Sequence, residues 1–269
     1  MYVLTPPTYY NVAYSINPWM DTNIQPSNNF WDQWLDVYSA ILNTGESVSL
    51  INPDPNLPDL VFAANYGSFI DDKFFLSTFK YQERAPEKLI VARWCVDNKI
   101  TVTPMPDGIC FEGDGDLVRT GNNLYAMGYG YRSDFEAAKF ISEHTNKEIV
   151  PLKLCNPYFY HLDTCFMPIR IKEKTIILYY PGAFAEQSIP ELFYQYTTIP
   201  VDSEEAHNFV CNSVSYHKNN QTVIIMSNKN ARISKLLESY GCKVISINIS
   251  EFSKAGGGVR CMVLHRQEN

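Results

Sequence analysis

Apolar side chains recur at helical spacing in three parts of the chain. Between 30 and 42 they share one helical face, and Gly45 follows as a stop signal. The letters SDFE at 133–136 match a capping box and predict a helix that runs to about 144. A third stripe, from 233 to 240, ends directly before a glycine. The sequence therefore predicts at least three amphipathic helices.

Short apolar and β-branched runs lie between these helices and predict strands. They are found near 47–51, 60–64, 73–79, 123–129, 164–171, 175–180, 222–226 and 243–247. Strands outnumber helices and alternate with them along the whole chain, which favours an α/β architecture over separate all-α and all-β halves. No linker rich in Pro, Gly or Ser and no block of charge divides the 269 residues, so we expect one domain over 1–269.

Composition and charge limit the classes of function. Apolar residues make up 45% of the chain and charged residues 19%, which is enough for a large core. The formal net charge is −7 and no lysine- or arginine-rich run occurs, which argues against binding to nucleic acid or to an anionic membrane. No apolar run approaches the length of a membrane span. An acidic protein is compatible with a cationic small-molecule substrate.

The cysteines indicate a reducing compartment. There are seven, an odd number, without a C-x-x-C pair, which fits reduced thiols better than a disulfide framework or a zinc site. The first twenty residues lack the charged and continuously apolar segments of a secretory signal. We therefore expect a cytoplasmic protein. No pattern in the sequence indicates an oligomeric state.

Cys261 follows three consecutive glycines, 256–258, and precedes a short apolar run. Glycines let the backbone approach a ligand closely and expose the next side chain in a pocket. From these residues alone, Cys261 is either a nucleophile or a buried structural thiol after a C-terminal turn, and most cysteines are of the second kind. A cysteine nucleophile also needs a nearby base and a group that orients this base.

His161 has the surroundings that best suit such a base. It stands between an aromatic run and a predicted strand, and Asp163 is two residues away, on the same face of an extended segment. A core histidine bonded to the backbone is the alternative. The letters FEGDGD at 111–116 alternate acids with glycines and predict either several inward carboxylates or an ordinary polar turn. They lack the spacing of an EF-hand.

Four segments together resemble the guanidino-group-modifying enzymes. VFAANYG (61–67), FEGDGD (111–116), YHLDTCF (160–166) and GGGVRCM (256–262) occur in the order expected of this family. The family includes arginine deiminases, amidinotransferases, dimethylarginine hydrolases and arginine dihydrolases. The resemblance spans about 11–263, nearly the whole chain. It implies the pentein fold, a five-bladed ββαβ propeller with its active site in the central channel.

The resemblance also implies roles for the residues in these segments. Cys261 is similar to the nucleophile that attacks the guanidinium carbon. His161 resembles the acid that protonates departing ammonia and then, as a base, activates water. Glu112 resembles the carboxylate that contacts this histidine and the substrate nitrogens, and Asp163 the carboxylate that binds the guanidinium. No metal ion and no organic cofactor are implied.

Four further residues are implied to bind the substrate. Arg84 and Arg132 lie where the family binds the substrate carboxylate, a task for which bidentate arginine is suited. Asn65 stands where deiminases, amidinotransferases and dimethylarginine hydrolases commonly carry aspartate, and its neutral amide suits a partly hydrolysed, ureido-like group. Asn17, in INPWM at 16–20, resembles an asparagine of the arginine dihydrolase branch. Its alternative role is to cap a turn.

The expected substrate is thus free arginine, converted to ornithine, carbon dioxide and two ammonia molecules. An arginine deiminase that stops at citrulline, an amidinotransferase, a dimethylarginine hydrolase and a non-catalytic binding module are the alternatives. Asp163 argues against the dimethylarginine hydrolases, which commonly carry lysine at this position. Tyr66 replaces a small residue of the family and is expected to narrow the pocket, whereas Asp114 has no assigned role.

Overall fold

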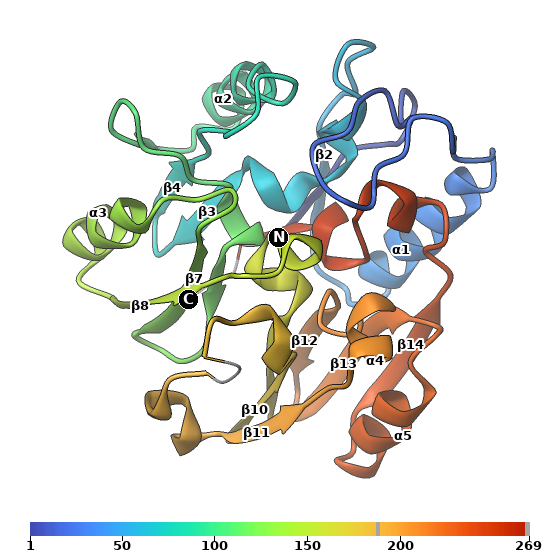
Figure 1. Ribbon diagram of the computed structural model, residues 1–269, viewed down its shortest axis with the longest axis vertical. Coiled ribbons are helices and arrows are strands. Elements are labelled where there is room, and N and C mark those ends of the chain that lie inside the picture. Colours follow the sequence, from blue (N-terminus) through green and yellow to red (C-terminus); the bar gives the residue numbers. More distant parts are fainter. Residues whose placement is uncertain (187–188, 267–269) are drawn as a thin grey trace.

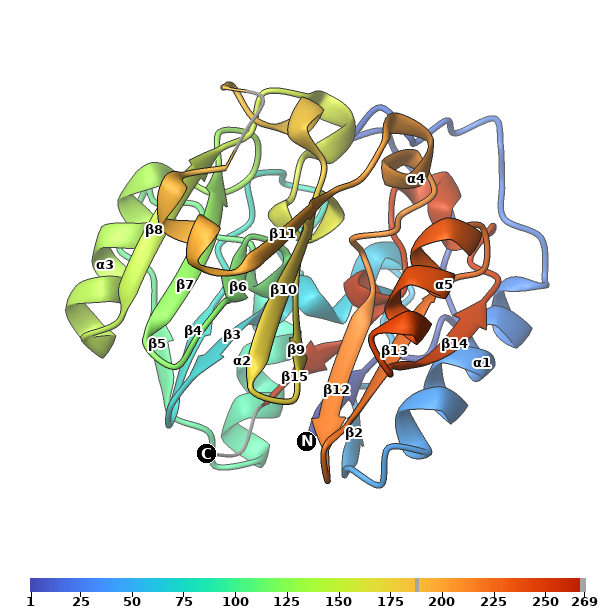
Figure 2. The same cartoon turned by 90° about the horizontal axis from the view of Figure 1, so that it is seen from below.

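Over residues 1–186 and 189–266, which the computed structural model describes, fifteen strands form five three-stranded sheets. In every sheet two strands pair antiparallel, and the third runs parallel to the central strand. The sheets stand around one channel and the longer helices lie on the outside (Figures 1 and 2). This arrangement confirms the predicted five-bladed propeller.

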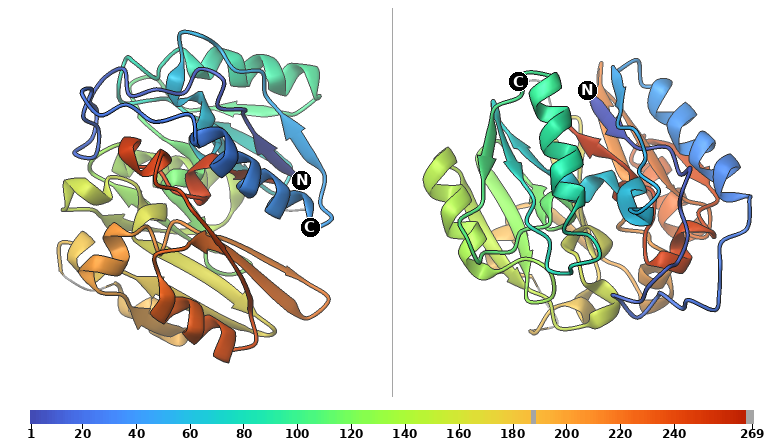
Figure 3. Two further views of the ribbon diagram at one scale, coloured as in Figure 1. Left: turned by 90° about the vertical axis from the view of Figure 1, so that its right-hand side faces the viewer. Right: turned by 90° about the horizontal axis from the view of Figure 1, so that it is seen from above.

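One blade joins segments from both ends of the sequence. β15 (Leu264–His265) pairs antiparallel with β1 (Tyr2–Leu4), and β2 (Val48–Leu50) pairs with β1 in parallel. α1 (Phe30–Leu42) connects β1 to β2 on the outer side (Figure 3). The ring of blades is therefore closed by a strand pair that is remote in sequence.

The other four blades follow the chain in order. Three of them have an α-helix in the parallel crossover. One consists of β3 (Gly67–Ile70), β4 (Lys73–Leu76), α2 (Glu87–Asp97) and β5 (Val102–Pro104), and the next of β6 (Leu117–Arg119), β7 (Leu124–Tyr129), α3 (Phe135–Thr145) and β8 (Glu148–Lys153). The third consists of β12 (Val214–Lys218), β13 (Gln221–Ser227), α5 (Ala231–Ser239) and β14 (Lys243–Ile247). The fourth consists of β9 (Phe166–Ile171), β10 (Lys174–Tyr179) and β11 (Thr197–Pro200). Its crossover includes the 3₁₀ turn Glu191–Gln195, and α4 (Ser203–His207) follows β11.

The predicted helices at 30–42, 133–144 and 233–240 are confirmed, but the capping box before α3 is wrong. Asp134 precedes the helix, and its carboxylate accepts a hydrogen bond from the Cys110 N–H at 2.7 Å instead of capping. The Ser133 hydroxyl accepts from the Glu112 N–H and donates to Asp116. These partners lie in another part of the chain, so the motif alone did not reveal them.

The strand predicted at 60–64 is also wrong. Two 3₁₀ turns, Pro58–Val61 and Ala63–Tyr66, occupy this segment. The Phe62 N–H donates to the Asp59 carbonyl at 2.9 Å, and the Asn65 N–H donates to the Phe62 carbonyl at 3.1 Å. An apolar run indicates burial, not conformation, and here the buried backbone satisfies part of its hydrogen bonding within the turns.

Candidate active site

Five short loops lead into the first strands of the five blades, and these strands line the channel. In four blades the loop contains a 3₁₀ turn: Ala63–Tyr66, Gly113–Gly115, Leu162–Thr164 and Arg260–Met262. One residue stands at the equivalent position of each loop, and these positions are 49 residues apart. The five residues are Asn65, Asp114, Asp163, Asn212 and Cys261. The propeller thereby places one such side chain from each blade in the channel.

Cys261 is buried, with 3% of its surface exposed, and its sulfur has polar neighbours on two sides. The Asn212 side-chain amide donates to Sγ at 3.1 Å, and Oδ2 of Asp163 lies 3.8 Å from Sγ. The Cys261 N–H in turn donates to the Asn212 side-chain carbonyl at 3.1 Å. The thiol is therefore held in a fixed polar setting, which differs from that of an inert core cysteine.

His161 and Glu112 form a buried pair beside Arg132. Nε2 of His161 lies 2.8 Å from Oε2 of Glu112, and Nη1 of Arg132 donates to the same oxygen at 3.0 Å. Oε1 of Glu112 accepts from the Lys80 N–H at 3.0 Å. The structure thus brings together the predicted general acid–base and the carboxylate that was expected to contact it.

A second network holds the loops of this pair in register. The Ser133 hydroxyl accepts from the Glu112 N–H at 3.0 Å and donates to Oδ2 of Asp116 at 2.6 Å. Oδ1 of Asp116 accepts from the Leu162 N–H at 3.1 Å. Because Leu162 follows His161 directly, Asp116 links the backbone beside Glu112 to the backbone beside His161. These positioning contacts were not predicted from the sequence.

The electrostatics keep the thiol and the imidazole neutral before substrate binds. Burial and the neighbouring Asp163 raise the pKa of Cys261 above its usual range. Burial lowers the pKa of His161 to about 4, although Glu112 opposes this shift. Burial would raise the pKa of Glu112, but Arg132 and His161 outweigh it and lower that pKa below its usual range. Glu112 is therefore the ionised member of this group.

Asp163 has an oxygen without a partner. Its Oδ1 is buried and lacks a hydrogen bond from any described residue, while Oδ2 faces the Cys261 sulfur. Burial raises the pKa of Asp163 to about 7, with Arg260 and Asn212 opposing the shift. A buried carboxyl with an unpaired oxygen carries a free-energy cost that a hydrogen-bond donor would remove. This arrangement suits a cationic group placed above the sulfur.

Arg84 makes four hydrogen bonds within the protein. It forms a bidentate ion pair with Glu87, at 2.7 and 2.8 Å, and also donates to Oδ1 of Asn65 at 2.8 Å and to the Asp59 carbonyl at 3.3 Å. The Asn65 amide donates to the Glu112 carbonyl at 3.3 Å. Arg84 thus sets the orientation of Asn65, a role that the sequence did not suggest.

Arg132 makes two hydrogen bonds to described residues, fewer than Arg84. Besides Glu112, it donates to the Ile16 carbonyl at 2.9 Å. Its guanidinium is stacked between the rings of Tyr81 and Tyr160, 4.7 and 4.5 Å from their centroids. Two aromatic faces and two hydrogen bonds hold it rigidly at the cavity wall.

A small cavity of about 10 Å³ lies in front of Cys261 and is called the substrate cavity below. Its wall includes Asn17, Asn65, Arg84 and Arg132. The loop between β1 and α1 closes it, because the half-buried Asn17 donates to the Ala255 carbonyl at 3.0 Å and accepts from the Trp19 N–H at 2.9 Å. The structure therefore places four of the five predicted binding residues in the wall of this cavity, and the fifth, Asp163, contacts the sulfur.

Two polar residues at this site were missed by the sequence analysis. Asn212 could have been found from the 49-residue interval, which the five loops share. Asp59 lines the substrate cavity, and its Oδ1 is buried without a hydrogen-bond partner among the described residues. In the sequence, the only indication of this position was an acidic residue between apolar neighbours, in LPDLVF. Burial raises the pKa of Asp59 above its usual range.

One expectation about the pocket is wrong. Tyr66 does not narrow it: the side chain is fully buried in the core, and its hydroxyl bonds with Thr5 and the Leu60 carbonyl. Of the glycines before Cys261, Gly257 lines the substrate cavity, and the other two serve contacts within the protein. A Cβ on Gly258 would lie 2.7 Å from Oδ1 of Asn212, and Gly256 adopts a left-handed φ of 81°.

The described part of the chain has neither a helix long and apolar enough to span a membrane nor a cluster of three or more His, Cys, Asp or Glu that could hold a metal ion. Asp114, which had no predicted role, forms an ion pair at 2.7 Å with Arg260, the residue before Cys261. The reactive groups that the structure places at this site are a thiol, an imidazole and carboxylates.

Comparisons with known proteins agree with this geometry. A family model described as "N,N dimethylarginine dimethylhydrolase, eukaryotic" matches residues 18–266. The bifunctional arginine dihydrolase/ornithine cyclodeaminase AgrE of Nostoc is 36% identical over 274 aligned positions, which cover 99% of this chain and 38% of that protein. The N(G),N(G)-dimethylarginine dimethylaminohydrolase of Mycobacterium tuberculosis is 34% identical, over 98% of this chain and 84% of that protein.

A solved structure of a relative has the same fold. The N-terminal domain of the cyanobacterial arginine dihydrolase ArgZ, as a cysteine-to-serine mutant bound to substrate, superposes with a TM-score of 0.90 and 34% identity. The match covers 98% of this chain and 96% of that one. The chain spans about two fifths of the full-length curated proteins AgrE and ArgZ.

Proposed function

Because the chain belongs to the dimethylarginine dimethylhydrolase family of guanidino-modifying penteins, we propose that it hydrolyses the guanidinium of free arginine through a covalent intermediate on Cys261. The observation that carries the proposal is the unpaired Oδ1 of Asp163, in a carboxyl whose Oδ2 lies 3.8 Å from the sulfur. A guanidinium there would pair with this carboxylate and place its carbon near Sγ.

We propose that the two ends of arginine are bound by different groups. The guanidinium lies between Asp163 and Glu112. The α-carboxylate binds Arg132, whose described contacts use two of its five N–H groups. The α-ammonium pairs with Asp59, whose Oδ1 lacks a partner among the described residues. Arg84, an expected carboxylate ligand, instead acts through Asn65, because it already makes four hydrogen bonds in the protein.

The cationic substrate also activates the nucleophile. Burial and Asp163 raise the pKa of Cys261 in the free protein. A bound guanidinium neutralises Asp163 and brings positive charge to the sulfur, and both effects favour the thiolate. The Asn212 amide, 3.1 Å from Sγ, donates to the thiolate as well. The nucleophile is therefore formed only when substrate is present.

The covalent cycle then needs one acid–base group. As substrate binds, Cys261 passes its proton to the neutral His161. The thiolate attacks the guanidinium carbon, and His161 returns this proton to the ammonia that departs. Water next adds to the amidino-thioether, His161 takes its proton, and the C–S bond breaks to release citrulline. Glu112, at 2.8 Å from Nε2, stabilises the imidazolium that forms twice in this cycle.

A second cycle on the retained citrulline gives ornithine, carbon dioxide and a second ammonia. In support, Asn65 presents a neutral amide near the reacting group, where a carboxylate would repel a ureido oxygen. Asn17 lies on the loop that closes the cavity and so would slow the release of citrulline. AgrE and ArgZ, the arginine dihydrolases at 36% identity, also favour this outcome.

Hydrolysis of dimethylarginine is the second candidate, because the family model and the mycobacterial relative carry that name. Release of citrulline after one cycle and transfer of the amidino group to an amine are the further alternatives. A non-catalytic binding module is the weakest one, since Glu112, His161 and Cys261 would have no use in it. We also propose that residues 1–269 form one catalytic domain without metal or cofactor, and that it acts in the cytoplasm, where its free thiols stay reduced.

The test is turnover of purified protein with arginine, agmatine and N,N-dimethylarginine in parallel. Arginine should be the best substrate, and agmatine should be weaker because it lacks the carboxylate for Arg132. Replacement of Cys261 by Ser should abolish turnover while arginine binding remains. Turnover by this variant would refute the assignment of the nucleophile, and a preference for dimethylarginine would favour the second candidate.

A further inference from the structure

A second cavity, called the channel cavity here, lies within the propeller and has a volume of about 130 Å³. Residues of β3, β6, β9, β12 and β15 line it, which are the first strands of the five blades. The substrate cavity is lined instead by loops that precede such strands. Since each first strand leads away from its loop, the two cavities occupy opposite ends of one channel.

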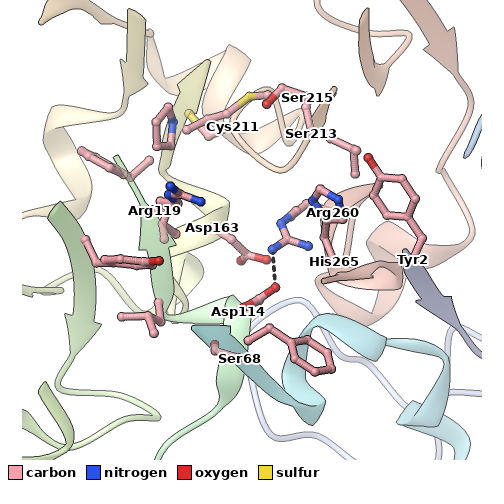
Figure 4. A pocket seen from close by; sticks show the side chains of 18 of the residues that line it. Tyr2, Ser68, Asp114, Arg119, Asp163, Cys211, Ser213, Ser215, Arg260 and His265 are labelled. Atoms are coloured by element: carbon pink, nitrogen blue, oxygen red, sulfur yellow. Dashed lines mark hydrogen bonds and ion pairs between the residues drawn. The ribbon is translucent and has the colours of Figure 1, made fainter. Parts of the chain in front are cut away.

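A thin layer of side chains separates the two cavities. Cys261 lines the substrate cavity and Asp163 lines the channel cavity, yet Sγ and Oδ2 of these residues are only 3.8 Å apart. Figure 4 shows the carboxylates of Asp163 and Asp114 beside the guanidinium of Arg260, with the Arg260–Asp114 ion pair dashed. The channel cavity therefore reaches the far side of the nucleophile.

The polar groups of the channel cavity suit water. The Tyr2 hydroxyl is buried without a hydrogen-bond partner among the described residues, and the Ser213 side chain also lines the cavity. Buried polar groups are commonly satisfied by water, which needs roughly 10–15 Å³ of such space per molecule. The volume of about 130 Å³ admits several. At the outer end the wall includes the exposed Asp71 and Arg119, so the cavity reaches solvent.

The proposed chemistry needs water at a place that the substrate itself blocks. The substrate cavity holds only about 10 Å³ and is closed by the loop that carries Asn17. While the amidino group is attached to Cys261, the remainder of the substrate fills this side of the channel. We propose, on the basis of the function above, that the channel cavity supplies the hydrolytic water by a route separate from that of the substrate.

The hydrolytic step consumes one water molecule and regenerates the thiolate. Water from the channel cavity passes Asp163 and adds its oxygen to the carbon of the amidino-thioether, while His161 takes a proton. The C–S bond then breaks, the electron pair returns to Cys261 as thiolate, and the carbon keeps the oxygen as a ureido group. No oxidant, reductant or further reactant is required. In a second round the same route supplies a second water.

The inference is tested by filling the channel cavity away from the reacting groups. Ser215 lines it, from β12 (Figure 4). Ser215→Phe should slow only hydrolysis of the intermediate, so kcat and KM should fall together by about tenfold or more while kcat/KM is kept. Intact mass measured on enzyme quenched during turnover should show a Cys261 adduct. The matched variant Ser215→Ala, which does not fill the space, should behave as the wild type.

Two other outcomes overturn the proposal. One is a Ser215→Phe enzyme with the kcat of Ser215→Ala and no adduct. The other is a kcat/KM that falls without an adduct, which indicates general damage to the site. If Ser215→Phe does not fold, Val118→Trp, on β6 in the same wall, replaces it. If the proposed function itself is wrong, the wild-type protein turns over no guanidino substrate. This result distinguishes that failure from a failure of the water route alone.

Discussion

Asn212 holds Cys261 at both its backbone and its sulfur. The Asn212 side-chain carbonyl accepts from the Cys261 N–H at 3.1 Å, and its amide donates to Sγ at 3.1 Å. The two residues occupy equivalent positions in neighbouring blades, 49 residues apart. This contact fixes the direction of the thiol and provides a donor for the thiolate, whose formation burial otherwise opposes.

Replacement of Asn212 by Ala should therefore weaken the nucleophile. A hydrogen bond to a charged group contributes about 1.5–3 kcal/mol, so kcat/KM for arginine should fall roughly 10- to 100-fold. The rate of Cys261 alkylation by iodoacetamide, followed against pH, should also shift to higher pH. An alkylation profile identical to that of the wild type would show that Asn212 does not stabilise the thiolate.

Substrate binding should depend on the ionisation of Asp163. Burial raises the pKa of its carboxyl to about 7, so below pH 7 the group is protonated and cannot pair with a guanidinium. In the Cys261→Ser background, the Kd of arginine measured by calorimetry should rise about tenfold per pH unit below 7.

The matched control is Asp163→Asn in the same Cys261→Ser background. It should bind arginine weakly at every pH and show no such slope. An equal slope in both proteins would assign the titration to another group. Circular dichroism at each pH verifies that the variants stay folded over the range used.

The buried Arg84–Glu87 pair should stabilise the fold strongly. Both side chains are almost completely buried, and Arg84→Met leaves the Glu87 carboxyl without its partner. Such a change typically costs about 3–5 kcal/mol in the free energy of unfolding, measurable by urea denaturation. The control is Arg93→Met in the exposed Arg93–Asp97 pair of the same helix, which should cost about 1 kcal/mol or less. Equal losses of unfolding free energy in the two variants would show that the buried pair stabilises the fold no more than the exposed one.

Asn65 should decide how many ammonia molecules leave. Asn65→Asp keeps an acceptor for Arg84 but loses the amide that donates to the Glu112 carbonyl, and it adds charge beside the ureido group. We expect the ratio of ornithine to citrulline to fall at least about tenfold, with the first ammonia released at a nearly unchanged rate. Chromatography of the amino-acid products measures the ratio. An unchanged ratio would remove Asn65 from the second cycle.

Much of the propeller could be predicted from the sequence, and so could most of the residues that the structure brings together at the candidate site. Periodicity located α1, α3 and α5 because each has a clear apolar face, and the four motifs placed Cys261 and His161 in one site through family resemblance. α2 was missed because its buried face includes a charged residue, Glu87, which only its contact with Arg84 explains. The segment at 60–64 was misassigned because an apolar run does not distinguish a strand from buried 3₁₀ turns.

The roles that depend on partners could not be read from residue types. Arg84 resembled a substrate ligand, but its contacts with Glu87 and Asn65 are visible only in three dimensions. Tyr66 was expected at the pocket, yet its hydroxyl bonds place the ring in the core. The 49-residue interval was present in the sequence all along and would have indicated Asn212.

The most direct test of the central claim is the stoichiometry of arginine turnover by the wild-type protein. Ammonia, citrulline and ornithine are quantified together from one reaction with limiting arginine, run to completion. Two cycles on each substrate molecule should give one ornithine and two ammonia molecules for each arginine consumed, with citrulline present only transiently. Citrulline as the end product, with a single ammonia for each arginine, would contradict it.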